Sequence, residues 1–152
     1  MLPSSPSSDP ADRGSAALEF ILVGMLLLVP LVYLIVSLGL IQGQSLGAEA
    51  GARHIARALS TAESPDAARR SADLILRSVI EEYALEPEAV DVSLECRPGG
   101  GNCPEAGATL VVTVSTRVAL PLVPPVLGLD RVASIPLEAS AVQKVSRFWE
   151  SE

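Results

Sequence analysis

The sequence has little of what enzymes and nucleic-acid-binding proteins use. It holds one histidine, His54, and shows no nucleophile–histidine–acid set, no cluster of metal ligands and no phosphate-binding loop. The net charge is −7 and Lys144 is the only lysine, so a nucleic-acid role has no basic surface to rest on. These absences predict a protein that is not an enzyme and that uses no cofactor, metal or nucleic acid.

Aromatic residues are also scarce. They make up 3% of the chain, whereas hydrophobic residues make up 49%, so the apolar content is leucine, valine, isoleucine and alanine. Much of it lies in one N-terminal stretch. A chain of 152 residues has room for about one domain, and roughly 90 to 100 residues remain outside that stretch to form it.

Only two cysteines are present, Cys96 and Cys103, and they flank the sequence Pro98-Gly99-Gly100-Gly101. In an oxidising compartment this spacing predicts a disulfide across a tight loop, which would contribute on the order of 2 to 3 kcal/mol to stability. Free thiols are the main alternative. A metal site would need more ligands, and His54 is far away in sequence.

The N-terminal third predicts a leader followed by a membrane span. Residues 1–12 are mostly Ser, Pro and Asp, which is typical of a disordered leader. The 22 residues from Phe20 to Ile41 carry no charge. As a helix they would cover about 33 Å, enough to cross a hydrocarbon core of about 30 Å. The alternative, a buried helix of a soluble core, would be unusually long and apolar.

Four glycines recur every four residues near the end of this span: Gly39, Gly43, Gly47 and Gly51. A stripe of small residues lets another helix approach closely, because no side chain stands in the way. The alternative is that the glycines only loosen the helix at the membrane surface. Each costs roughly 0.8 to 1 kcal/mol relative to alanine, so four at equal spacing favour a packing role.

The rest of the chain predicts a second helix and a sheet. The first helix should continue to about Leu59, and Ser64-Pro65-Asp66 is typical of a new helix start, with that helix running to about Tyr83. Beyond Pro87 the apolar residues alternate with polar ones, as in half-buried strands. The predicted strands cover 90–96, 110–118 and about 133–145, the first two forming an antiparallel hairpin. The fold class is therefore α+β: a long N-terminal transmembrane helix, a second helix and a small three-stranded antiparallel sheet.

An apolar, proline-rich loop, 119–128, separates the last two strands. Apolar loops usually fold back on a core, but this one has a second possible use, in contact with a partner or the membrane.

The junction before the span carries the functional signal: Arg13-Gly14-Ser15-Ala16-Ala17-Leu18-Glu19-Phe20. An unpaired charge in a membrane helix costs several kcal/mol, so Glu19 should have a partner or a purpose. If the chain is cut between Gly14 and Ser15, a new α-amino group lies at the helix start. Glu19 then follows at i+4, where its carboxylate complements the helix dipole and can neutralise an N-terminal ammonium, its own or a neighbour's.

This string resembles the class III signal of type IV prepilins, in which a glycine, four residues, a glutamate and an aromatic residue precede a long apolar helix. With its short leader and single helix, the chain resembles the TadE-like pseudopilins of tight-adherence (Flp) pilus systems. The resemblance covers residues 13 to about 60, and the C-terminal half matches in architecture only. Two features depart from the family: Phe20 stands where tyrosine is common, and the leader holds one arginine against two aspartates.

The resemblance implies cleavage after Gly14 by a prepilin peptidase and a role of Glu19 in subunit packing. With Phe20 beside it and the four glycines, Glu19 makes up the predicted assembly residues. The chain would act as a minor pseudopilin, with other pseudopilins and the pilus assembly platform as partners. Residues 1–14 would be the leader, 15–62 the transmembrane and juxtamembrane helix, and 63–152 an extracytoplasmic domain in a single-pass protein of the cell membrane. Because Arg53 and Arg57 follow the span, this orientation depends on the cysteine pair and the resemblance rather than on flanking charge.

Two other functions stay open. Ala48-Glu49-Ala50 supplies small residues at the −3 and −1 positions of a conventional signal-peptide cleavage site, which would release a soluble domain beginning at Gly51. Against it, the apolar stretch is far longer than the 7 to 15 residues of a signal peptide. The other alternative is a single-pass envelope protein without a pilus role.

Overall fold

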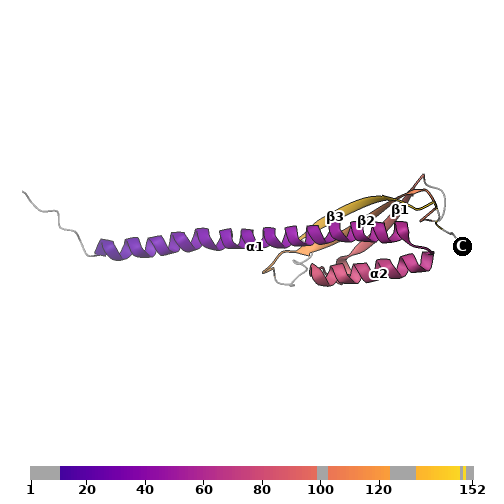
Figure 1. Cartoon of the computed structure of the whole chain (residues 1–152). Coiled ribbons are helices and arrows are strands. Elements are labelled where there is room, and N and C mark those ends of the chain that lie inside the picture. Colours follow the sequence, from indigo (N-terminus) through magenta and orange to yellow (C-terminus); the bar gives the residue numbers. More distant parts are fainter. Residues whose placement is uncertain (1–10, 99–102, 124–132, 148, 150–152) are drawn as a thin grey trace, which may run out of the picture. The chain divides into compact units, whose positions relative to one another are not determined.

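The computed structural model describes residues 11–98, 103–123, 133–147 and 149, with side chains from Ala16 onward. Their secondary structure is α1 (Ala11–Thr61), α2 (Pro65–Glu82), a 3-10 helix η1 (Pro87–Ala89), β1 (Asp91–Arg97), β2 (Thr109–Ala119) and β3 (Ser134–Lys144) (Figure 1). The three strands form one antiparallel sheet in the order β1-β2-β3. The predicted α+β fold is confirmed. The chain divides into two compact units, Met1–Leu38 and Gly39–Glu152.

Helix α1 begins earlier than the sequence predicts. Its first residue is Ala11, so Ala11 and Asp12 are helical rather than part of a disordered leader. Extending an existing helix requires no new nucleation, which explains why the apolar stretch carries one more turn in front of it. The rest of the predicted disordered stretch, residues 1–10, lies outside the described residues.

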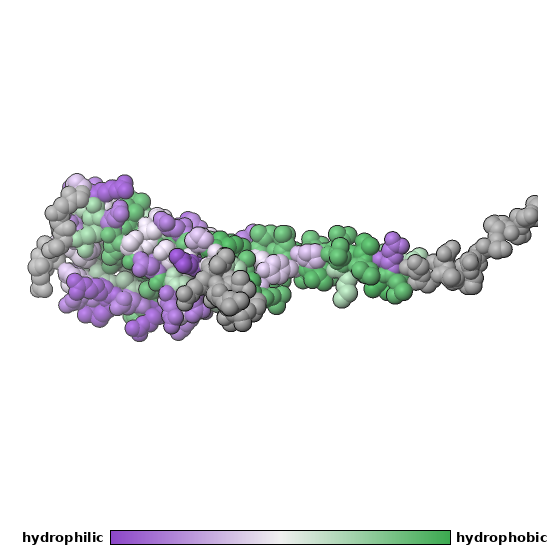
Figure 2. All heavy atoms as spheres, turned by 180° about the vertical axis from the view of Figure 1, so that it is seen from behind, coloured by the Kyte–Doolittle hydropathy of each residue, from purple (hydrophilic) through white to green (hydrophobic). Residues whose placement is uncertain are grey.

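The first unit exposes nearly all of its apolar side chains. Every Leu, Ile, Val, Met and Phe from Leu18 to Leu38 is between 47% and 80% exposed. The face of this unit seen in Figure 2 is correspondingly green over most of its length. Within the described residues, α1 is the one helix long and apolar enough to cross a membrane, by length and composition. Pro30 lies inside α1 without ending it.

Helix α2 has the predicted start and end. The Ser64 side chain accepts a hydrogen bond from the Ala67 backbone N–H at 3.2 Å, and Pro65 occupies the first turn, where its missing N–H costs nothing. At the other end Tyr83 is the C-cap, and Ala84 has a positive φ of 49°. The Leu85 N–H reaches back to the Ile80 carbonyl at 3.0 Å, which closes the helix.

The core of the second unit lies between the helices and one face of the sheet. Alternate residues of β2 are buried, as a half-buried strand requires. They meet the small-residue face of α1. The buried cluster comprises Ala48, Ala52, Ile55, Ala56, Leu59, Ala68, Leu110, Val112, Val114, Ala141, Val145 and Trp149. The opposite face of the sheet is polar, with Thr113 and Ser140 hydrogen-bonded side by side at 2.9 Å.

Candidate functional site

The predicted processing point lies inside α1. Gly14 and Ser15 are its fourth and fifth residues, since the helix begins at Ala11. If the chain is cut between them, the new terminus is already helical, and the first backbone N–H groups of the shortened helix have no internal acceptors. A carboxylate one turn further on is well placed to interact favourably with that positive helix end.

Glu19 supplies this carboxylate. It is the one charged residue between Ala16 and Leu38, and its side chain is exposed. The ion pairs among the described residues join Arg53 to Glu49, Arg69 to Asp66 and Arg97 to Glu95, all outside the first unit. Phe20, beside Glu19, is 80% exposed. Glu19 and Phe20, two of the six residues predicted to mediate assembly, are therefore exposed.

The four glycines at positions 39, 43, 47 and 51 lie in two different surroundings. A Cβ added at Gly47 would lie 2.6 Å from both Cβ and Cγ of Tyr83, and one at Gly51 would lie 3.4 Å from Cγ1 of Val79. Among the residues that the structure describes, none lies within 4 Å of the same position at Gly39 or Gly43. The partner of Gly47 and Gly51 is therefore α2 and its cap within the same chain. Of these four glycines, Gly39 and Gly43 are the two that no described residue covers.

The end of α2 explains this division. Tyr83 caps the helix opposite Gly47, and the next carbonyl, that of Ala84, accepts a hydrogen bond from Gln44 Nε2 at 3.2 Å. The chain then turns away into η1 and the sheet, so α2 has no residues left to cover the two earlier glycines. The sequence marks Gln44 only as a polar residue in an apolar helix, which is a weak signal for this contact.

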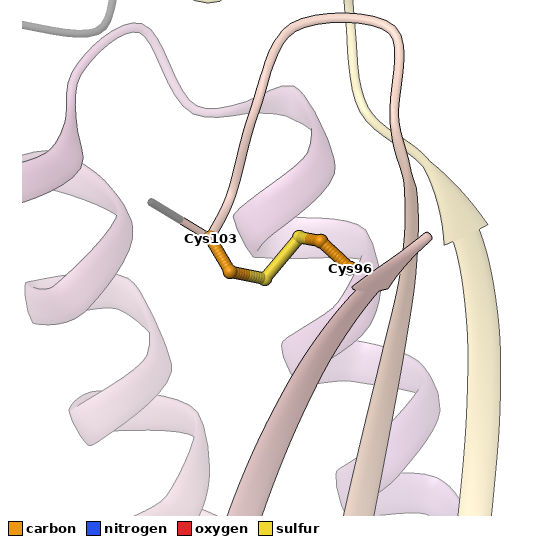
Figure 3. The surroundings of a disulfide bond; sticks show 2 residues. All are labelled: Cys96 and Cys103. Carbon is orange, nitrogen blue, oxygen red and sulfur yellow. A yellow bond between two sulfur atoms is a disulfide. The ribbon is translucent and has the colours of Figure 1, made fainter. Parts of the chain in front are cut away.

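The predicted disulfide between Cys96 and Cys103 is present, with a Cα–Cα distance of 5.6 Å. Figure 3 shows the disulfide joining Cys96, in β1, to Cys103, in the segment that leads into β2. Both cysteines are half-buried and pack against the core cluster. The bond therefore ties the β1–β2 loop to the core.

The double variant Cys96→Ser/Cys103→Ser should lose about 2 to 3 kcal/mol of unfolding free energy, because the unfolded chain regains the freedom of the loop. Chemical denaturation of detergent-solubilised protein, followed by the fluorescence of the buried Trp149, measures this loss. Reduced wild-type protein is the control and should unfold at the same denaturant concentration as the variant. An unchanged midpoint in both would show that the bond contributes nothing to stability.

One hollow of the second unit is lined by residues of α1, η1 and the sheet. It has a volume of about 750 Å³ and is lined by Gln44, Ala84, Glu86, Glu88, Ala89, Asp91, Ser115, Arg117, Ala119 and Ser134. Among the described residues, no three His, Cys, Asp or Glu side chains are grouped to hold a metal. His54 is exposed on α1. The surfaces that bear on the predicted assembly are the apolar helix face, Glu19 and the two open glycines.

Comparison of the chain with protein-family models, with curated proteins and with solved structures found no match.

Proposed function

We propose that this chain is a minor pseudopilin of a tight-adherence type IV pilus or a related secretion system. In this proposal a prepilin peptidase cleaves between Gly14 and Ser15, and the mature subunit assembles through its N-terminal helix. The observation that carries the proposal is the apolar segment of α1 over residues 18–38, whose large apolar side chains are exposed and whose single charged residue, Glu19, follows the cut by one turn. Resemblance of residues 13 to about 60 to TadE-like pseudopilins supplies the class.

Membrane anchoring is the first step of the proposal. Soluble monomers rarely expose apolar patches larger than a few hundred Å², and the first unit exposes large apolar side chains from Leu18 to Leu38. A lipid bilayer or the helices of neighbouring subunits would cover this surface. The Cys96–Cys103 bond favours an extracytoplasmic second unit, because disulfides form and persist in oxidising compartments.

Release by signal peptidase has little support from the fold. A cut after Ala50 would divide α1 inside the second unit and remove Ala48, which is 1% exposed in the core. It would also sever the ion pair between Glu49 and Arg53. A single-pass envelope protein without a pilus role is the remaining alternative. The use of Gly47 and Gly51 inside the fold favours it to some degree, because fewer glycines are left for assembly.

The mature N-terminus tests the proposal. Protein extracted from its native membrane should begin Ser-Ala-Ala-Leu-Glu, because a prepilin peptidase would remove residues 1–14. Edman degradation or mass spectrometry of the terminal peptide reads this sequence. Uncut protein beginning at Met1 would contradict the pseudopilin proposal, and a start at Gly51 would favour secretion instead.

A further inference from the structure

The first strand of the sheet stops short of the second. β1 pairs with β2 only from Thr109 to Ser115, whereas β3 pairs with β2 along its full length, from Thr109 to Ala119. Among the described residues, no backbone group from outside the sheet bonds to residues 116–119. The backbone groups of a strand point alternately to its two sides, so two of these four residues direct their N–H and C=O groups away from β3. This side of residues 116–119 is the open edge of β2.

A hollow of about 750 Å³ lies against the open edge. Arg117 and Ala119 of β2 line it on one side, and the segment from Glu86 to Asp91, which leads into β1, lines it on the other. All ten lining residues are described and belong to the second unit. Three of them are alanines, whose short side chains leave room: Ala84, Ala89 and Ala119. Four residues of an added strand would cover about 13 Å along this edge.

The hollow has an excess of negative charge. Glu86, Glu88 and Asp91 line it and are exposed, and Arg117 is the one basic residue of the lining. The three ion pairs that the described residues form lie elsewhere, so none of these carboxylates has a basic partner among them. Complementary charges across a contact speed association and select the partner. A segment that enters the hollow should therefore carry lysine or arginine.

Gln44, at the α1 side of the hollow, presents an acceptor that lacks a donor. Its Nε2 donates to the Ala84 carbonyl at 3.2 Å, while its Oε1 is buried and accepts no hydrogen bond from the described residues. A buried polar atom without a partner costs free energy. Because Gln44 lines the hollow, a donor on an incoming segment would satisfy this oxygen.

We propose that the open edge of β2 binds a short extended segment of another protein. The segment adds to the sheet in line with β1 and places lysine or arginine side chains beside Glu86, Glu88 and Asp91. Main-chain hydrogen bonds to β2 supply the affinity, and the carboxylates supply the selectivity. The site lies wholly within the second unit and depends neither on the membrane anchor nor on the proposed function.

Fluorescence anisotropy of a labelled hexapeptide, (Lys-Val)3, tests the proposal with the full chain in a nonionic detergent. The peptide should bind, and its binding should weaken with added salt. Glu86→Gln/Glu88→Gln should weaken binding on the order of fivefold, because two exposed charge pairs are lost. The matched control, Glu81→Gln/Glu82→Gln, removes the same charge from two exposed acids of α2 that do not line the hollow, and it should bind like the wild type.

Three further peptides separate strand addition from attraction between charges. (Glu-Val)3 should not bind. Two versions of (Lys-Val)3, methylated at the backbone nitrogens of all lysines or of all valines, keep the charge. Because alternate N–H groups of a strand face β2, one of the two should lose binding and the other should keep it. Absence of binding by (Lys-Val)3, equal binding of both methylated peptides, or an equal loss in the two glutamine double variants would each overturn the proposal.

Discussion

Glu19→Ala should leave the protein membrane-bound and cleaved but abolish its assembly. The span keeps its apolar length, so insertion should not change, and the cut precedes Glu19 by five residues. Once subunits pack in lipid, water can no longer solvate a carboxylate or a terminal ammonium, and each charge unpaired there costs about 2.5 kcal/mol or more. Without Glu19 the α-amino group of a neighbour loses its partner. Fractionation, terminal sequencing and crosslinking of assembled material measure the three properties separately.

Two controls isolate the charge from the side chain. Glu19→Gln keeps the size of the side chain and cannot neutralise an ammonium, so it should fail in the same way as Glu19→Ala. Glu88→Ala removes an exposed acid from the second unit and should assemble normally. If Glu19→Ala assembled at the wild-type level while cleaved and membrane-bound, the span would be only an anchor, and the single-pass envelope alternative would take its place.

Gly47→Ala should destabilise the second unit, whereas Gly43→Ala should not. The new methyl group at Gly47 would lie 2.6 Å from two carbons of Tyr83, so the helix or the ring has to move. Such overpacking typically costs about 1 to 3 kcal/mol. At Gly43 the position is open, and alanine should stabilise the helix by about 0.5 to 1 kcal/mol. Chemical denaturation in detergent, followed by the fluorescence of Trp149, measures both changes.

A double variant tests whether contact with Tyr83 causes the loss of stability in Gly47→Ala. Removing the ring in Tyr83→Ala makes room, so Gly47→Ala should cost less in that background than in the wild type, and the difference is the coupling energy of the pair. Equal costs in the two backgrounds would rule out the contact. Gly43→Leu complements this test: it should keep the fold but weaken crosslinking between subunits, because the open face is then blocked.

The local structure of the second unit was predictable from the sequence. Ser64 and Pro65 predict a helix start, because the first N–H groups of a helix have no partner within it. The serine side chain accepts a hydrogen bond from one of them, and proline has no N–H to leave unpaired. Strict alternation of apolar residues fixes the strands, and the cysteine spacing gives the disulfide. Each of these signals is local, with its physical cause within a few residues of the feature. The predicted end of the disordered stretch, at Asp12, was wrong, because the helix start at Ala11 follows from extension of the long helix.

The use of the glycines was not predictable. The equal spacing of the glycines indicates that another helix can approach α1 closely. It does not indicate whether that helix belongs to the same chain or to another subunit. Four residues advance a helix by about 400°, so the stripe turns by about 120° from Gly39 to Gly51. The ring of Tyr83 reaches Gly47, and that contact depends on where α2 ends in space.

The central claim is that Glu19 pairs with the cleaved terminus of a neighbouring subunit, and zero-length crosslinking tests it most directly. A carbodiimide joins a carboxylate to an amine in contact, and this chain has few amines, since Lys144 is its only lysine. Applied to native envelopes, the reagent should link the Glu19 peptide to an N-terminal peptide. A mixture of isotope-labelled and unlabelled chains shows whether the linked N-terminal peptide comes from a second copy of this chain. If it comes from another pseudopilin, its amino-acid sequence shows this. Assembled protein in which Glu19 is linked to no terminal amine, while the reagent does couple Lys144, would contradict the claim.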